Sequence, residues 1–259
     1  MLGIPLDENS SYLKGAATGP QHIRTAFHSP SSNYCTESGH DLSKDNRWKD
    51  GGDMLLSAMP RALMEIEQGI AAQLNIGNKV LSLGGDHSIS YPVIKAFSRV
   101  YTNLNVLHID AHADLYHDFE GNPYSHASPF ARVMEEGLVR RLVQVGIRTL
   151  NPHQKEQAEN FGVEIIEMKN WNDSMRFSFD GPLYISLDLD ALDPAFVPGV
   201  SHHEPGGFTT RQVFSIFQNL EADLIGADIV ELNPSRDISN MTAMVAAKLF
   251  KELRAKLLD

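Results

Sequence analysis

The chain has 259 residues, of which 42% are hydrophobic, and its formal net charge at pH 7 is −11. This length and apolar content can build one large α/β core, so we expect a single domain over residues 1–259. The negative charge argues against nucleic acid and acidic membranes as partners and favours a small cationic ligand. Cys35 is the only cysteine, which excludes an internal disulfide framework, and no apolar stretch approaches the roughly 18 residues of a membrane span. We expect a cytoplasmic protein, or one of an organellar matrix if a transit peptide has been removed.

Short apolar runs alternate with longer amphipathic segments along the chain, a pattern typical of a parallel sheet covered by helices. After a strand-like start at residues 1–5, a short helix is expected over residues 20–27 and a polar surface loop over residues 30–52. The predicted strands are residues 79–83, 105–110, 142–147, 163–168, 183–188 and 224–232. The predicted longer helices are residues 54–74, 88–99, 129–136, 152–160, 209–220 and 242–257. Together these elements predict an α/β fold with three layers, αβα, around a mostly parallel central sheet.

A motif of alternating acidic and histidine residues follows the predicted strand 105–110. Asp110, His112 and Asp114 occupy alternate positions, which project to the same side of an extended chain. Burying three ionisable groups on one face has a desolvation cost that a metal ion or dense pairing must offset. The motif therefore predicts a metal site.

Two further segments place metal-binding side chains after predicted strands. Asp188 and Asp190 repeat the alternate spacing, and His87 follows Gly-Gly-Asp after residues 79–83. Taken alone, the histidine is more often a loop or core residue, and the Asp-x-Asp pair is often a turn former. In an open parallel sheet, however, ligands bind beyond the carboxyl ends of strands. Six oxygen and imidazole ligands are too many for one mononuclear site and suit two divalent ions such as Mn²⁺.

With these motifs the chain resembles the ureohydrolase family of arginases and agmatinases. The matching segments are Gly84-Gly-Asp-His-Ser88, Asp110-Ala-His-Ala-Asp114, Ser186-Leu-Asp-Leu-Asp-Ala-Leu-Asp-Pro194 and Gly226-Ala-Asp-Ile-Val-Glu-Leu-Asn-Pro234. Residues 120–128, 199–207 and 241–248 are similar to plant-type arginases in particular. The resemblance covers about residues 3–255. It implies an arginase-like fold, two Mn²⁺ ions per chain, and hydrolysis of a guanidino group to urea by a metal-bridging hydroxide.

The resemblance also implies how the six ligands divide between the two ions. Asp110 and Asp188 would bridge the ions. His87 and Asp114 would complete one site, and His112 and Asp190 would complete the other. Carboxylate bridges reduce the repulsion between paired cations, which accounts for the excess of acidic ligands.

The expected catalytic residues are Asp114, His126 and Glu231. By family similarity, Glu231 holds the planar guanidinium through two charge-assisted hydrogen bonds, and His126 protonates the leaving amine. Without the resemblance, Glu231 could equally form an ordinary salt bridge, and His126 could be a solvent-facing loop residue. Asp228 could support a neighbouring ligand or cap local structure.

The substrate is the least determined feature. Asn122 and Ser125 are expected to bind the head group of an amino acid, whereas Asp118 and Glu120 could instead attract an amine. We expect L-arginine to be hydrolysed to ornithine and urea. Agmatinase, which forms putrescine and urea, and another guanidino-acid hydrolase are the alternatives among enzymes, and a metal-binding pseudoenzyme is the alternative among other proteins.

Two further expectations concern assembly and the loop at residues 202–203. Ureohydrolases are commonly trimers or hexamers, so the resemblance implies a homo-oligomer. His202 and His203 stand where many relatives have a Thr-Gly-Thr-type loop, so the role of that loop does not transfer. A deacetylase of the related fold would use one zinc ion, which the complete Asp-x-His-x-Asp motif disfavours.

Overall fold

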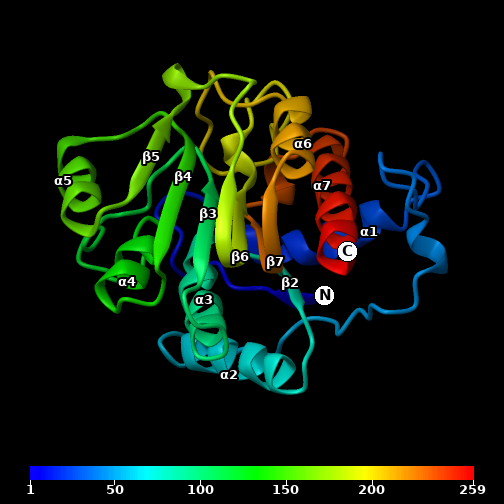
Figure 1. The fold of residues 1–259 in the computed structure, drawn as a ribbon, viewed down its shortest axis with the longest axis horizontal. Helices are drawn as coiled ribbons and strands as arrows, with labels where there is room; N and C mark the ends of the chain where they lie inside the picture. Colours follow the sequence, from blue (N-terminus) through cyan, green and yellow to red (C-terminus); the bar gives the residue numbers. More distant parts are fainter.

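A seven-stranded parallel sheet forms the centre of the molecule (Figure 1). The computed structural model describes residues 1–259. The strand order is β1-β2-β7-β6-β3-β4-β5, and every neighbouring pair is parallel. The strands are β1 (Leu2–Ile4), β2 (Val80–Gly84), β3 (Asn105–Ile109), β4 (Arg141–Ile147), β5 (Glu164–Glu167), β6 (Ser178–Asp188) and β7 (Glu221–Val230).

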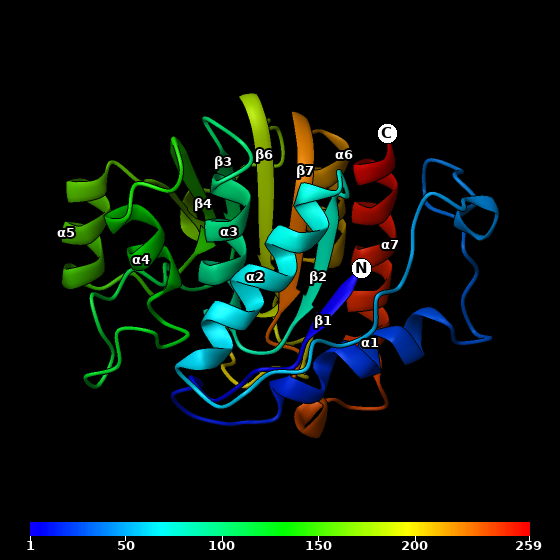
Figure 2. The same ribbon diagram turned by 90° about the horizontal axis from the view of Figure 1, so that it is seen from below.

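Seven α-helices cover the two faces of this sheet (Figures 1 and 2). They are α1 (Gly19–Phe27), α2 (Arg61–Asn75), α3 (Ser90–Ser98), α4 (Pro129–Glu135), α5 (Pro152–Phe161), α6 (Thr210–Gln218) and α7 (Met241–Leu258). One buried apolar cluster joins α1, α6 and α7 to the sheet, and a second joins α2, α3, α4 and α5 to it. The expected three-layer αβα fold is confirmed. No helix combines the length and the apolar character that crossing a membrane requires.

The helix expected over residues 54–74 begins only at Arg61. Pro60 precedes it, and a proline disfavours helical backbone in the residue before it, here Met59. The segment before the proline instead lies against the helix, where the backbone N–H and hydroxyl of Ser57 donate to the Glu65 carboxylate at 2.7 and 2.8 Å. Apolar periodicity therefore located the helix but not its first residue.

Strand β6 is longer than expected because it begins at Ser178 rather than at residue 183. Its register against β7 is irregular between Ser178 and Pro182. Pro182 has no N–H to donate to a neighbouring strand, which interrupts the regular pairing of the early part of β6. This part also lacks the apolar pattern of a central strand. The buried second half of β6 leads directly to Asp188.

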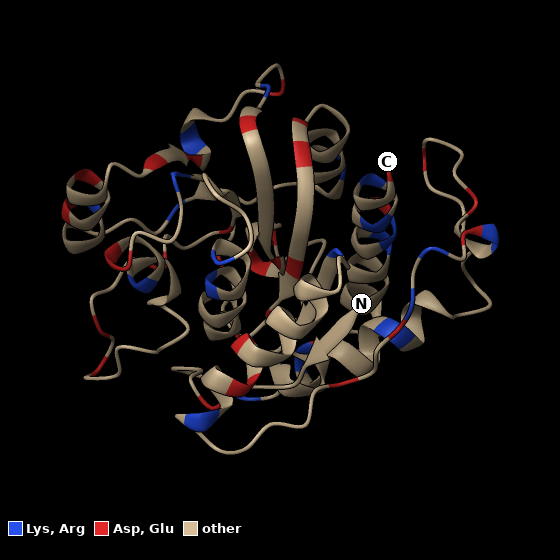
Figure 3. Cartoon of the chain, turned by 60° about the horizontal axis from the view of Figure 1, so that its bottom comes forward, with Lys and Arg blue, Asp and Glu red and all other residues tan.

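Parallel pairing brings the carboxyl ends of β2, β3, β6 and β7 to one edge of the sheet. His87 follows β2, Asp110 follows β3, Asp188 ends β6 and Glu231 follows β7. Figure 3 shows acidic segments where β6 and β7 end. The fold thus gathers segments that are more than a hundred residues apart in the sequence.

Gly85 fits the end of β2 against the loop that follows β1. A Cβ atom at Gly85 would lie 1.8 Å from the backbone oxygen of Leu6. The same oxygen accepts a hydrogen bond from the N–H of Asp86 at 2.8 Å, and the Gly85 oxygen accepts one from the N–H of Glu231 at 2.8 Å. Only glycine allows this approach without moving backbone that carries site residues.

We therefore expect Gly85→Ala to destabilise the protein by about 3 kcal/mol, because the new methyl group meets backbone rather than a flexible side chain. Gly137→Ala is the matched control. Gly137 has φ 63°, and a methyl group there would have no other atom within 4 Å, so only a left-handed backbone cost of about 1 kcal/mol applies. Chemical denaturation measures both free energies of unfolding, and equal losses would contradict the proposed contact with Leu6.

Candidate metal centre

His87 lies at the centre of the first group of candidate ligands. Its Nδ1 is 3.0 Å from Oδ2 of Asp110, 3.1 Å from Oδ2 of Asp114 and 3.2 Å from Oδ2 of Asp188. All four side chains are at least nine-tenths buried. The three carboxylates come from the ends of β3 and β6, so four ligand atoms from three strand ends meet around one point.

His112 forms a second group with Asp190 and Asp110. Its Nδ1 lies 3.0 Å from Oδ2 of Asp190 and 3.5 Å from Oδ1 of Asp110. Asp110 thus directs one oxygen toward His87 and the other toward His112, and it is common to both groups that could hold a metal ion. Asp188 also joins the groups, because its Oδ1 accepts from the N–H of Asp190 at 2.7 Å. The sequence-predicted set of six is brought together in two linked groups.

The donor geometry around His87 fits a bound cation. Nε2 of His87 lies 2.9 Å from Oγ of Ser186, whose hydroxyl donates to the Asp228 carboxylate at 2.8 Å. Ser186 therefore accepts the Nε2 hydrogen, and Nδ1, which makes no hydrogen bond, faces the three carboxylates with its lone pair. Ligands about 2.1 Å from one cation in octahedral geometry are about 3 Å apart, as these atoms are.

The same conclusion follows from the charges. Burial, with the nearby charges of Asp190 and Asp110, raises the pKa of Asp188 well above its usual range. Burial and Asp110 also raise the pKa of Asp190 to about 6, although His112 opposes this. Burial lowers the pKa of His87, but the facing carboxylates outweigh it and raise that pKa well above its usual value. Both groups of side chains therefore favour positive charge at their centre, and a divalent cation would supply it.

Glu231 and His126 lie beside the candidate ligands. Oε1 of Glu231 accepts from the backbone N–H of His87 at 2.9 Å and lies 2.8 Å from Nδ1 of His126. No hydrogen bond within the protein uses Oε2. Glu231 has φ 67°, a conformation that strains any residue except glycine and that recurs at functional sites.

Ser11 holds the other nitrogen of His126. Its backbone N–H donates to Nε2 at 3.1 Å, and its Oγ lies 2.8 Å from the same atom. The fixed N–H requires a lone pair on Nε2, so the ring hydrogen is on Nδ1 and is donated to Glu231. Burial lowers the pKa of His126, but the Glu231 charge outweighs it and raises that pKa to about 9. The Ser11 N–H opposes this effect and favours the neutral ring.

These side chains line a cavity of about 200 Å³ that opens at the carboxyl edge of the sheet. Besides the candidate ligands, Glu231 and His126, the lining includes Ser11, Tyr116, Phe119, Thr149, Gln154, His202 and Glu204. Asn122 and Ser125 do not line it. Nδ2 of Asn122 donates to Asn9, and Ser125, which is 3% exposed, accepts from the N–H of Ala127. The expected head-group role of Asn122 and Ser125 stays a prediction.

Comparison with known proteins agrees with this arrangement. A sequence profile described as the Arginase family matches residues 1–255. Arginase 1, mitochondrial, of Arabidopsis thaliana is 46% identical over 280 residues, which cover 99% of this chain and 80% of that protein. The chain belongs to the arginase family. The arginase from Medicago truncatula superposes with a TM-score of 0.94 at 43% identity, over 99% of this chain and 86% of that one. Human guanidino acid hydrolase, mitochondrial, is 34% identical over 273 residues, covering 97% of this chain and 76% of that protein.

Membership of the arginase family confirms the predicted resemblance and the enzyme class, a ureohydrolase. The structure shows the contacts of Asp228, whose role the sequence left open. Asp228 is fully buried and accepts from Ser90, Tyr184 and Ser186, each at 2.8 Å. Through Ser186 it orients His87, so it supports a candidate ligand rather than capping local structure.

His108 is a supporting residue that the sequence did not single out. It is fully buried, and its ring stacks on Phe130 at a centroid distance of 3.9 Å. The Gln144 amide donates to its Nδ1 at 3.0 Å, so Nε2 carries the hydrogen and donates to Oδ2 of Asp110 at 2.6 Å. The only sequence signal was its place two residues before Asp110, on the same side of the strand.

Arg148 ties the second ligand group to the loop that follows β6. Its guanidinium donates to the backbone oxygens of Asp190 at 2.7 Å, Ala191 at 3.2 Å and Glu204 at 2.9 Å. It also reaches the oxygen of Gly146 at 3.2 Å. One side chain therefore fixes the turn that carries Asp190 and the segment that carries Glu204, which borders the cavity.

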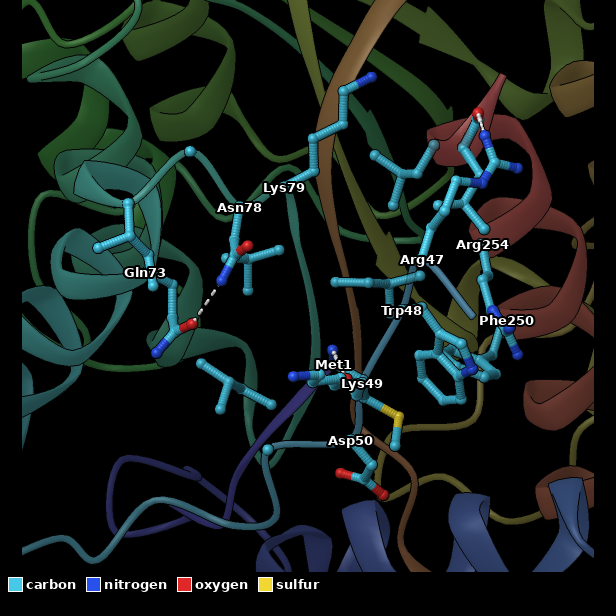
Figure 4. Close-up of a pocket in the computed structure, with 18 residues that line it drawn as sticks. Met1, Arg47, Trp48, Lys49, Asp50, Gln73, Asn78, Lys79, Phe250 and Arg254 are labelled. Carbon is cyan, nitrogen blue, oxygen red and sulfur yellow. Dashed lines mark hydrogen bonds between the residues drawn. The ribbon is translucent and has the colours of Figure 1, made fainter. Parts of the chain in front are cut away.

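A larger cavity of about 660 Å³ lies at the opposite edge of the sheet, beside the amino ends of β1 and β2. Figure 4 shows Trp48, Phe250 and Arg254 on one side of it and Gln73 and Asn78 on the other. None of the sequence-predicted site residues lines this cavity, and its charged residues are mostly basic. Size alone therefore does not locate the chemistry in this member of the arginase family.

We expect Arg148→Met to weaken binding of Mn²⁺ at least tenfold, because residues that orient metal ligands typically contribute this much to affinity. Calorimetric titration with Mn²⁺ measures the change, and circular dichroism reports whether the fold is kept. Arg148→Lys retains a hydrogen-bond donor and should lose less affinity for Mn²⁺. Arg140→Met is the control, since Arg140 is 54% exposed and has one ion pair of 3.6 Å with Asp180. Equal affinity in the Arg148→Met and Arg140→Met proteins would contradict the role of Arg148.

Proposed function

We propose that this chain hydrolyses L-arginine to L-ornithine and urea with two Mn²⁺ ions. The observation that carries the proposal is the sharing of Asp110 between two His/Asp groups, in a chain of the arginase family. His87 and Asp114 would hold one ion and His112 and Asp190 the other, with Asp110 and Asp188 between them. Two ions bound there would supply a hydroxide nucleophile at neutral pH, because coordination lowers the pKa of water.

Glu231 is proposed to bind and orient the guanidinium. Its Oε1 is already held by His87 and His126, which fixes the carboxylate and leaves Oε2 for the substrate. A guanidinium N–H can donate to Oε2 in a charge-assisted hydrogen bond, and because the carboxylate is fixed this contact orients the substrate. Since Glu231 lies directly beside the candidate ligands, the guanidinium is held next to the metal centre.

His126 is proposed to supply the proton for the leaving amine. It holds a hydrogen at Nδ1, which faces Glu231 and hence the proposed guanidinium position. Ser11 occupies Nε2 and keeps the ring from rotating away. The ring acts as an acid in its doubly protonated form, which the Glu231 charge favours; there Nε2–H can donate to Oγ of Ser11 while Nδ1 gives up its proton, so the ring returns to the neutral state.

Agmatine is the second candidate substrate, and one observation favours it. No lysine or arginine lines the cavity, whereas five carboxylates do, so a substrate with an amine end meets an attractive field. Another guanidino acid remains the third candidate. A pseudoenzyme that only binds metal would release no urea from any of these substrates.

The remaining proposals concern the chain as a whole. We propose one domain over residues 1–259, supported by a single sheet whose strands come from residues 2–230. We also propose a homo-oligomer, a trimer or a hexamer, on the strength of the family alone. A cytoplasmic or organellar-matrix location stays a proposal, and the Arabidopsis relative bears the name mitochondrial.

Urea release from L-arginine by the Mn²⁺-loaded protein tests the function directly. We expect activity that a chelator abolishes and that Mn²⁺ restores, with about two Mn²⁺ per chain by elemental analysis. Agmatine and 4-guanidinobutyrate serve as comparison substrates. Faster hydrolysis of agmatine would replace the proposed substrate, and absence of urea with all three would refute a ureohydrolase function for this chain.

The different roles proposed for Asp190 and Glu231 predict different outcomes for two conservative variants. Asp190→Asn should lower both Mn²⁺ content and urea release, because it removes a charged ligand. Glu231→Gln should keep both Mn²⁺ ions while reducing kcat/KM at least a hundredfold, because a neutral amide cannot pair with a guanidinium. Elemental analysis and urea assays on the same preparations measure both effects. If Glu231→Gln also loses metal, Glu231 does not act on the substrate alone.

A further inference from the structure

His202 lies one step further out than His126 on the path from the metal centre to solvent. Its ring is 5.2 Å from that of His126 and 5.9 Å from that of His112, centroid to centroid, and it lines the same cavity. On its outer side it contacts Tyr12, which is 67% exposed, at 5.7 Å. A group bound at His202 would therefore sit between Glu231 and the mouth, where the far end of a guanidino substrate must lie.

The loop that carries His202 is fixed on both sides. The hydroxyl of Ser201 donates to the Leu13 oxygen at 2.9 Å and accepts from Nδ2 of Asn233 at 2.9 Å. Two residues beyond His202, the Glu204 oxygen accepts from Arg148 at 2.9 Å. The imidazole is thus held at a defined position on the cavity wall.

His202 is also a side chain on this wall whose ring nitrogens the protein leaves unused. Neither of its ring nitrogens has a hydrogen-bond partner within the chain. By contrast, Ser11 is engaged by His126, Thr149 donates to the Ala111 oxygen at 3.2 Å, and the Tyr116 hydroxyl accepts from Asn151 at 2.6 Å. A half-buried imidazole with free nitrogens is ready to bind a polar group of a ligand.

The charges of the cavity indicate which group that is. Asp114, Asp188, Asp190, Glu204 and Glu231 line it, with no lysine or arginine. An amine is attracted anywhere along such a wall and needs no dedicated partner. A carboxylate is repelled unless it meets a hydrogen-bond donor, and His202 offers an uncommitted ring nitrogen next to His126 and the exposed Tyr12.

We propose that His202 binds the α-carboxylate of the amino-acid substrate and thereby determines selection of arginine over agmatine. The proposal rests on the proposed ureohydrolase function and names the residue that binds the end of the substrate opposite the guanidinium. Discrimination of this kind comes from groups that contact the part of the substrate in which the candidates differ. The ornithine product carries the same carboxylate, so its binding reports the same contact without hydrolysis.

Binding of L-ornithine and of putrescine to the Mn²⁺-loaded protein tests the proposal, because these two amines differ only in the carboxylate. We expect His202→Ala to weaken ornithine binding at least tenfold, as loss of a hydrogen bond to a charged group predicts, and to change putrescine binding less than twofold. His202→Asn retains an N–H donor and should recover most of the ornithine affinity. Calorimetry measures all the dissociation constants.

His203→Ala is the matched control. The adjacent His203 is exposed, and its Nε2 lies 2.7 Å from the Pro198 oxygen, outside the residues that line the cavity. It should leave both ligands unaffected. Equal weakening of ornithine and putrescine by His202→Ala, no weakening of either, or no measurable binding of ornithine to the unaltered protein would each overturn the proposal.

Urea assays separate this proposal from the function on which it rests. If the unaltered protein releases urea from arginine, the ureohydrolase function stands whatever His202→Ala does. In that case His202→Ala should raise KM for arginine at least tenfold while leaving kcat/KM for agmatine within twofold. A parallel fall for both substrates would overturn the role of His202 alone, whereas absence of urea from every guanidino substrate would refute the proposed function.

Discussion

Repulsion between buried carboxylates is the constraint on which the rest of the structure depends. Asp110, Asp188 and Asp190 lie within one small volume with almost no exposure to solvent. Such charges persist in a protein interior only when cations or many hydrogen bonds compensate them. The surrounding residues serve that need: His108 donates to Asp110, and Arg148 fixes the turn of Asp190. Stability of this edge of the sheet and affinity for metal are therefore linked through the same contacts.

The parallel sheet is what makes such a concentration of charge achievable. Each strand ends at the same edge, so a residue within five positions of a strand end reaches the centre without a long loop. The cost appears as backbone strain, because Asp114 and Glu231 have φ of 50° and 67°. Hydrogen bonds from neighbouring strand ends hold these conformations, as when the Glu231 N–H donates to the Gly85 oxygen. The chemistry thus depends on rigid strand ends rather than on mobile segments.

The sequence predicted the elements and ligands that show a regular spacing of residues along the chain. It did not predict the residues whose role depends on contacts with side chains or backbone far away in the sequence. Alternate spacing gave Asp110, His112 and Asp114, and apolar runs gave six strands in addition to the strand-like start at residues 1–5, which is β1. The first residue of α2 was misplaced because a single proline outweighs apolar periodicity. Arg148 and Ser11 carry no local signal, since an arginine after a strand and a serine in a loop are common, and their partners are about 40 and 115 residues away. Asn122 and Ser125 were predicted from their position along the chain; in the structure Asn122 donates to Asn9 and Ser125 accepts from Ala127, and their head-group role stays a prediction.

The inner end of the cavity is formed by strand ends and the outer end by loops, and this difference has a functional consequence. The metal centre and Glu231 stand on strand ends that a seven-stranded sheet holds in register. The outer wall, with Ser11 and His202, comes from loops whose sequence can change without disturbing that register. Every guanidino substrate presents the same group to the inner end, so substitutions in the loops can redirect the enzyme to another substrate while the hydrolytic chemistry is kept. Under the role proposed for it, an exchange at His202 is a change of this kind, because the residue lines the cavity and makes no hydrogen bond within the protein.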